Sequence, residues 1–275
     1  MIYYHLIFLK GDSEMNGILL FDLDGTLLRS DKTISERTLA AIEKSRRAGY
    51  VIGVSTSRSK SNSRKFIGSL SPEIIISSGG AMVTLNGLDI VTEEFDGEET
   101  ARIIAAARRI CGDLNITADT ADENAEYFRN FTPPADELEK SWGTSIFTDF
   151  NGFDKPAMKL CFEIADDEKA RLLGEELSWC DFLHFTDGDW YKVTKAGVTK
   201  ENAINRLCTY LSITPEVMTA FGDDLADIGM LGMCGTGVAM GNALPEVKAA
   251  ADIIIGTNDE DGIAVYLEEY LRKRA

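Results

Sequence analysis

Short, largely apolar runs recur along this chain, and they constrain its fold more than any other feature. The runs are GILLF, YVIGV and EIIIS in the first third of the sequence, and VMTAF, TGVAM and ADIII in the last third. A strand without polar alternation is buried on both faces, and the helical segments between the runs indicate parallel pairing. The sequence therefore predicts an α/β fold built on a doubly wound, Rossmann-like parallel sheet.

The segment 84–189 has a different pattern. Two helical stretches, EETARIIAAARRICG and DEKARLLGEEL, alternate with strand-like stretches such as AMKLCFEIA and DFLHFTDGDWYKV. We interpret this segment as an α+β domain inserted into the parallel-sheet domain, which would comprise residues 17–83 and 190–275.

Residues 1–16 are expected to form an N-terminal extension outside the core. The opening MIYYHLIFLK is too short to span a bilayer, and it lacks the basic segment and the cleavage site of a signal peptide. Met15 comes shortly before the first predicted strand, which suggests that residues 1–14 derive from an upstream start codon.

The net charge restricts the classes of partner. The 275 residues include 28 Lys and Arg against 45 Asp and Glu, which gives a formal charge of −17. Nucleic acids and anionic membranes would meet a repulsive field, so we expect neither as a partner. A small anionic substrate stays compatible if the site supplies a local cation or a metal. The five cysteines are widely spaced without a C-x-x-C pair, which favours a cytoplasmic protein without a zinc knuckle.

Four polar motifs follow predicted strands or begin a helix. FDLDGTL follows the first strand and places Asp22 and Asp24 on either side of one leucine, and VSTSR follows the second strand. GVTKENAINRL begins a helix, and FGDDLADIGML follows a late strand. Because ligands bind at the carboxyl ends of parallel strands, these motifs are expected to meet at one edge of the sheet. Several carboxylates gathered there suit Mg²⁺, which would also remove the repulsion between Asp22 and Asp24.

With these motifs in this order, the chain resembles the haloacid dehalogenase superfamily of phosphatases. Within it, the chain is similar to the Cof-like subfamily, whose C2-type cap domain is inserted between the second and third motifs. The resemblance covers residues 17–275 and includes the trailing GVAMGNALPEVKAAADIIIGTNDEDGI. It implies a Mg²⁺ cofactor, an aspartyl-phosphate intermediate and an inserted cap that selects a small phosphorylated metabolite.

The resemblance implies a role for each residue of the motifs. Asp22 would attack phosphorus and bind the metal, and Asp24 would protonate the leaving group and ligate the metal through its backbone carbonyl. Asp22 should then stay ionised, whereas Asp24 should have a raised pKa. Asp223 would complete the metal shell, with Asp227 in support.

The resemblance also implies which residues hold the phosphoryl group. Thr56 would donate a hydrogen bond to it, and Lys200 would neutralise the charge that gathers on it and on Asp22. The full set of expected phosphate-binding residues is Gly25, Thr56, Ser57, Arg58, Lys200 and Asn242.

Several positions have competing interpretations. Lys195 competes with Lys200, Asp224 can merely charge a helix N-terminus, and Asn242 either contacts the site or closes a turn. Three positions depart from the usual motifs of the family: Ser57 and Ala226 stand where glycine and asparagine are common, and Gly79 replaces an asparagine. These departures affect the loop around Thr56 and the surroundings of the metal, so slow turnover is a possible consequence.

The leading hypothesis is a Mg²⁺-dependent phosphatase acting on small phosphate monoesters. Sugar phosphates, phosphoglycolate, and nucleotide, pyridoxal or flavin phosphates are all compatible substrates, and Arg129, Lys155 and Lys159 of the cap are candidates to bind an anionic group. One alternative is a phosphomutase that uses the same aspartyl-phosphate. Another is a non-catalytic protein that binds a phosphorylated ligand. The oligomeric state is left open.

Overall fold

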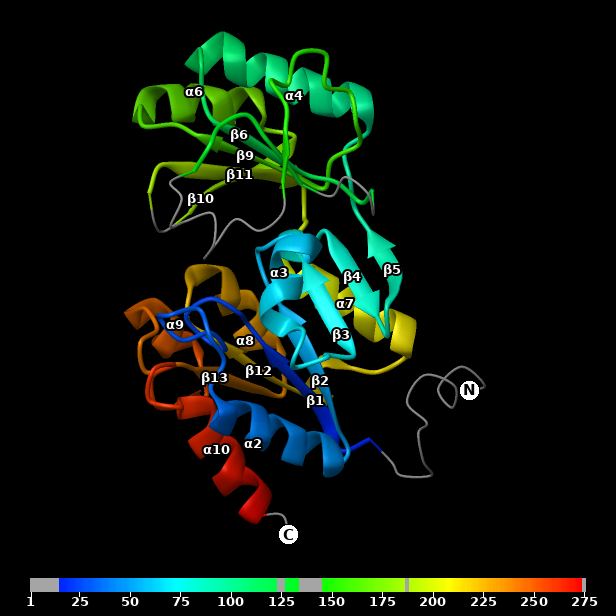
Figure 1. Ribbon diagram of the computed structural model, residues 1–275, viewed down its shortest axis with the longest axis vertical. Helices are drawn as coiled ribbons and strands as arrows, with labels where there is room; N and C mark the ends of the chain where they lie inside the picture. Colours follow the sequence, from blue (N-terminus) through cyan, green and yellow to red (C-terminus); the bar gives the residue numbers. More distant parts are fainter. Residues whose placement is uncertain (1–14, 123–126, 134–144, 186–187, 274–275) are drawn as a thin grey trace.

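The computed structural model describes residues 15–122, 127–133, 145–185 and 188–273. They form two sheets, of which the larger lies below the smaller in Figure 1. The extension expected at residues 1–14 lies outside the described residues. Within the described ranges, no helix combines the length and the hydropathy that crossing a bilayer requires.

The larger sheet has eight strands in the order β14-β13-β12-β1-β2-β3-β4-β5. Their bounds are β1 Gly17–Phe21, β2 Tyr50–Ser55, β3 Ile74–Ser77, β4 Met82–Leu85, β5 Leu88–Thr92, β12 Met218–Gly222, β13 Thr236–Ala239 and β14 Ile253–Ile254. From β14 to β3 every pairing is parallel. The chain starts at β1 and winds outward in both directions, which confirms the doubly wound fold.

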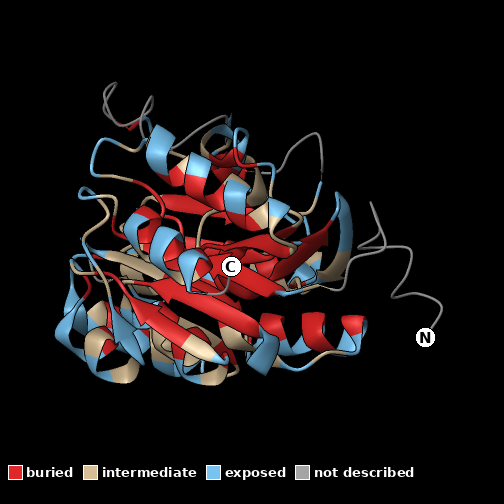
Figure 2. Cartoon of the chain, turned by 90° about the horizontal axis from the view of Figure 1, so that it is seen from below, coloured by how far each residue is buried: buried red, intermediate tan, exposed pale blue. Residues whose placement is uncertain are grey.

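Helices cover the parallel strands. They are α2 Glu36–Arg47, α3 Lys60–Ile67, α7 Lys200–Leu211, α8 Ile228–Met233, α9 Pro245–Ala250 and α10 Gly262–Arg272. Every residue of β1, β2 and β12 is buried, as expected for strands covered on both faces. Figure 2 shows the same arrangement, with buried residues concentrated in the strands and on the inner sides of the helices.

The strands β4 and β5 form an antiparallel hairpin that the sequence analysis did not predict. Their connection is Asn86 and Gly87, with φ of 49° and 83°. An Asn-Gly pair accepts positive φ at both positions, which makes it a strong signal for a tight hairpin turn. This signal was available in the sequence TLNGLDIV.

The smaller sheet has six strands in the order β10-β11-β9-β6-β7-β8, and all pairings except β7 with β8 are antiparallel. Their bounds are β6 Ile116–Asp119, β7 Tyr127–Arg129, β8 Ile146–Phe147, β9 Lys159–Glu163, β10 Cys180–His184 and β11 Trp190–Lys195. The helices α4 Gly97–Cys111 and α6 Asp167–Glu176 cover the face that points away from the larger sheet (Figure 1). This unit is the expected α+β insertion.

The sheets divide the chain at later residues than we expected. The hairpin strand β5 belongs to the larger sheet, although residue 84 was the expected start of the insertion. At the other end β11 begins at Trp190, the expected return point, but it pairs with β9 and β10 of the smaller sheet. We therefore propose that the inserted domain comprises residues 93–195.

Alternation along β6 and β9 separates the two faces of the smaller sheet. Ala118 and Leu160 are buried in the apolar core beneath α4 and α6. Their neighbours Asp119 and Lys159 point the opposite way and reach the larger domain, where they bond Ser78 and Ser57. The inserted domain thus presents a polar face to the edge of the larger sheet.

Candidate active site

The motifs meet at the carboxyl edge of the larger sheet. Asp22 follows β1, Thr56 follows β2, Asp223 follows β12, and Lys200 is the first residue of α7. A cavity of about 590 Å³ opens between this edge and the inserted domain. Of the expected site residues it is lined by Asp22, Asp24, Thr56, Ser57, Arg58, Lys200 and Asp227. The inserted domain contributes Thr117, Tyr127, Lys159, Cys161, Phe185 and Trp190.

A buried lysine joins two of the carboxylates. Lys200 Nζ lies 2.6 Å from Asp22 Oδ1 and 2.6 Å from Asp227 Oδ1, and all three side chains are less than a tenth exposed. Asp227 Oδ2 accepts the backbone N–H groups of Asp223 and Asp224 at 3.0 and 3.1 Å. Asp227 therefore holds both Lys200 and the loop that carries Asp223 in position.

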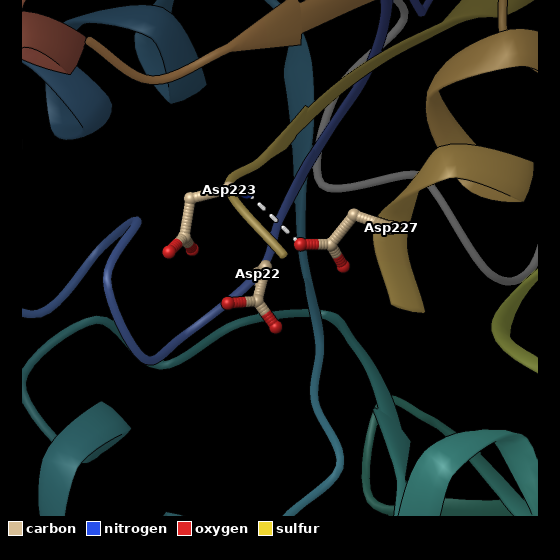
Figure 3. Close-up of side chains that lie close together, drawn as sticks. All are labelled: Asp22, Asp223 and Asp227. Atoms are coloured by element: carbon tan, nitrogen blue, oxygen red, sulfur yellow. Dashed lines mark hydrogen bonds between the residues drawn. The ribbon is translucent and has the colours of Figure 1, made fainter. Parts of the chain in front are cut away.

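Three carboxylates converge beside this lysine. One oxygen each from Asp22, Asp223 and Asp227 lies within 4.8 Å of the others, and Figure 3 shows how closely the three side chains gather. Burial raises the pKa of Asp22 well above its ordinary value; Lys200 opposes this effect, and the charges of Asp227 and Asp223 add to it. Burial likewise raises the pKa of Asp223 to about 6, although Thr26 donates a hydrogen bond to it.

This crowding is the physical reason to expect a cation. Without one, the raised pKa values mean that the cluster resists carrying its full negative charge. The donors are all oxygens, which is the set that Mg²⁺ prefers. The carboxylates of Asp22, Asp223 and Asp227 therefore fit a magnesium ion, which they would hold.

Asp24 lies in a different environment from the one we expected. Its carboxylate accepts hydrogen bonds from Arg58 Nε at 2.5 Å, from Arg58 Nη2 at 2.8 Å and from Lys32 Nζ at 2.8 Å. Burial alone would raise the pKa of Asp24, but the hydrogen bonds and charges of Arg58 and Lys32 outweigh it and lower the pKa to about 2. The expected raised pKa is therefore wrong for this arrangement, because two cations share one carboxylate.

Glycine is required at position 25 because the loop after β1 closely approaches the loop after β12. Its φ is +77°, and a Cβ atom added there would lie 2.2 Å from Asp223 Oδ2. Asn242 Nδ2 donates to the Gly25 carbonyl at 2.8 Å, while Asn242 Oδ1 accepts the N–H of Asn258 at 3.1 Å. Asn242 thus stabilises the loop that carries Gly25, and it is not among the described residues that line the cavity.

We expect Gly25→Ala to destabilise the protein more than Gly87→Ala. Both glycines have positive φ, so each alanine costs about 1 kcal/mol of backbone strain. Only at Gly25 does the new methyl group also collide with a carboxylate, which adds roughly 1 to 3 kcal/mol. Urea unfolding of both variants measures the difference. Equal losses of unfolding free energy would contradict the predicted collision, because open space surrounds Gly87.

The cavity is also lined by Thr56, Ser57, Asp224 and Ala226. Thr56 is 1% exposed, and its Oγ1 accepts the N–H of Arg58 at 3.1 Å. The Ser57 carbonyl accepts a hydrogen bond from Lys159 Nζ at 2.7 Å, so Ser57 links the two domains. Ala226 lies in the turn Leu225–Asp227 and lines the cavity, with Asp224 as the capping residue of that turn.

Among the cap candidates, only Lys159 lines the cavity. Arg129 donates to Ser145 Oγ at 2.6 Å and to the carbonyl of Phe131. Lys155 lies over the ring of Phe128, 5.9 Å from its centroid. Lys195, the competitor of Lys200, is 40% exposed and lies 3.8 Å from Glu99.

Sequence reasoning missed Lys32 and most of the wall that the inserted domain supplies. Thr117 and Cys161 sit on the polar face of that sheet, where polar and apolar residues alternate in ITAD and KLCFE. This period of two was a usable signal for a face turned toward a ligand. The ion pair of Lys32 with Asp24 depends on the folded loop, where Lys32 adopts φ +64°.

Comparisons with known proteins bear on the family and the fold of the chain. A family described as haloacid dehalogenase-like hydrolase matches residues 19–267. Two phosphatases of 5-amino-6-(5-phospho-D-ribitylamino)uracil from Bacillus subtilis are similar to the chain. YcsE is 30% identical over 256 residues, covering 92% of this chain and 95% of YcsE. YitU is 28% identical over 270 residues, covering 92% and 97%. A haloacid dehalogenase-like hydrolase from Bacteroides thetaiotaomicron shares the fold, with a TM-score of 0.80, 24% identity, and coverage of 92% of this chain and 99% of that one.

Proposed function

The chain belongs to the haloacid dehalogenase-like hydrolases and is a phosphatase of small phosphorylated metabolites, and we propose that it works with Mg²⁺ through an aspartyl-phosphate on Asp22. The observation that supports this proposal best is the geometry around Lys200. One buried ammonium contacts both Asp22 and Asp227, and Asp223 completes the acidic cluster. Phosphoryl transfer needs such charge neutralisation more than unusual functional groups.

In the proposed first step, an Asp22 carboxylate oxygen attacks phosphorus, and the bond from phosphorus to the ester oxygen of the substrate breaks. Lys200 lies 2.6 Å from that carboxylate and neutralises negative charge that develops on the phosphoryl oxygens. Thr56, which follows β2 and lines the same cavity, donates a hydrogen bond to the same group. The leaving alkoxide takes a proton and departs as an alcohol.

In the proposed second step, water attacks the phosphorus of the aspartyl-phosphate, which releases inorganic phosphate and regenerates the Asp22 carboxylate. Asp24 is the proposed acceptor of the proton of this water, but the ion pairs with Arg58 and Lys32 make its carboxylate a weak base, so it accepts the proton only after separating from them. To protonate the alkoxide in the first step, Asp24 must first leave these partners, because a pKa of about 2 disfavours the acid form. Bound Mg²⁺ would neutralise the cluster, keep Asp22 ionised and polarise the phosphoryl group.

The cavity is consistent with a small substrate. Its volume of about 590 Å³ lies within the usual range for small-molecule sites. YcsE and YitU are named for a phosphorylated ribitylaminouracil, so this compound belongs in a substrate panel beside sugar phosphates and phosphoglycolate.

The test is phosphate release across that panel, with Mg²⁺ and after its removal by a chelator. We expect release with Mg²⁺ and a loss of at least about a hundredfold without it, because the acidic cluster then lacks its counter-charge. Isomerised sugar phosphate without free phosphate would identify a phosphomutase instead. Ligand binding without any turnover would identify a binding protein.

A further inference from the structure

A second buried lysine lies at the interface of the two domains. Lys192 is in the middle of β11, on the polar face of the smaller sheet, and it is 7% exposed. Across the strands it lies beside Cys161, which lines the cavity, and Trp190 on the same face lines it too. Lys192 is therefore next to the wall of the proposed active site.

Among the described residues, none supplies an anionic partner for the ammonium of Lys192. Within the described part of the chain it has neither a hydrogen bond nor an ion pair. The neighbouring lysines have anionic partners of their own: Lys159 bonds Asp119 at 2.9 Å, and Lys200 bonds Asp22 and Asp227. The charge of Asp181 also acts on Lys192, without an ion pair between them among the described residues. Burial, followed by the charge of Lys159, lowers the pKa of Lys192 to about 8. A buried ammonium without a partner is costly, which points to a group that arrives with a ligand.

The surrounding backbone makes room for this ammonium. A Cβ atom at Gly79 would lie 3.1 Å from Lys192 Nζ, so the ammonium lies directly against the backbone at this glycine. The N–H of Gly79 donates to the carbonyl of Thr56 at 3.1 Å. The ammonium thus lies beside the loop that carries Thr56.

We infer that Lys192 binds a second anionic group of the substrate, a carboxylate or a further phosphate, in addition to the phosphoryl group that is transferred. The inference rests on the proposed function, and it narrows the substrate class to phosphate monoesters with two separate anionic groups. Lys192 would then act as a specificity residue. Lys159, already paired with Asp119, would hold the inserted domain on Ser57.

Three phosphonates that cannot be hydrolysed test this inference without requiring turnover. Propylphosphonate has one anionic group, phosphonopropionate adds a carboxylate, and propylene diphosphonate adds a second phosphonate. Calorimetric titration with Mg²⁺ present compares the full-length protein, Lys192→Met and Lys195→Met. Lys195 is the matched control, because it lies on the same strand but is 40% exposed.

We expect the unsubstituted protein and Lys195→Met to bind at least one doubly anionic ligand roughly tenfold to a hundredfold more tightly than propylphosphonate. The preferred ligand tells whether the second group is a carboxylate or a phosphate. Lys192→Met should lose this preference and bind propylphosphonate as before. Equal weakening for all ligands, a preference that survives the substitution, or no preference in the unsubstituted protein would overturn the inference.

Stability gives an independent readout. Methionine resembles lysine in volume, and replacing an unpaired buried charge with an apolar group should not lower the urea midpoint of unfolding. A lowered midpoint in Lys192→Met would mean that the ammonium is already paired, and would contradict the inference. If the binding preference is observed but no phosphate ester is hydrolysed, the proposed function fails and the anion site stands. If phosphate esters are hydrolysed but the binding preference is not observed, the proposed function stands and the anion site fails.

Discussion

Asp22→Asn is expected to lower the rate of phosphate release by at least about a thousandfold. An amide is not nucleophilic at phosphorus, and it cannot replace the carboxylate that lies 2.6 Å from Lys200. The substitution should not unfold the protein, because burial and the neighbouring carboxylates already disfavour the charge on Asp22. Steady-state phosphate release and urea unfolding, measured on the same preparation, separate these two effects.

A matched control for this substitution is Asp31→Asn. Asp31 is exposed, lies further along the same loop, and accepts its hydrogen bonds from Thr33. The Asp31→Asn substitution also replaces an aspartate with its amide. Because Asp31 is exposed, turnover should stay within about twofold of the original rate, as for most surface substitutions. If Asp22→Asn kept its turnover, the nucleophile would have to be another residue. Intact-mass detection of a phosphorylated protein in single-turnover samples would identify it.

Lys200→Met is expected to impair both catalysis and folding. Loss of a cation that stabilises the transferring phosphoryl group costs about a thousandfold or more in turnover. The substitution also leaves Asp22 and Asp227 buried without their shared partner, which lowers the free energy of unfolding by about 3 kcal/mol or more. Since carboxylates without a counter-charge bind a divalent cation better, added Mg²⁺ should restore part of this stability.

The matched control for this variant is Lys195→Met, because Lys195 is the other lysine near the start of α7. Its side chain is 40% exposed, and it lies 3.8 Å from Glu99 on α4, so we expect less than about 0.5 kcal/mol of destabilisation. If the two variants lost activity equally, the assignment of Lys200 to the site would be wrong. If Lys200→Met lost turnover but no stability, the buried ion pairs would contribute to catalysis alone.

The apolar runs of the sequence predicted the parallel-sheet domain, and they also predicted that its motifs meet at one edge of the sheet. Apolar runs such as GILLF indicate strands buried on both faces, and parallel strands end at the same edge. Asp22, Thr56 and Asp223 each follow such a run, so their proximity follows from strand order alone. The hairpin at Asn86 and Gly87 was equally local and could have been predicted from the same residues.

The inserted domain was harder to place because its contacts are not local. Lys159 and Asp119 are cross-strand neighbours that bond Ser57 and Ser78 of the other domain. Nothing within a few residues of either position specifies these partners. Packing of the whole polar face against the edge of the larger sheet decides them, and with them the wall of the cavity.

The sequence by itself thus determined the α/β fold, the inserted α+β unit and the meeting of the four motifs at one edge of the sheet. Only the tertiary structure decided the ionisation of their carboxylates. Asp24 was expected to have a raised pKa, but in the folded protein its pKa is lowered to about 2. The reason is that a pKa depends on burial and on charges within a few ångströms, which for Asp24 are Arg58 and Lys32. The spacing of two aspartates in a sequence carries no information about such neighbours.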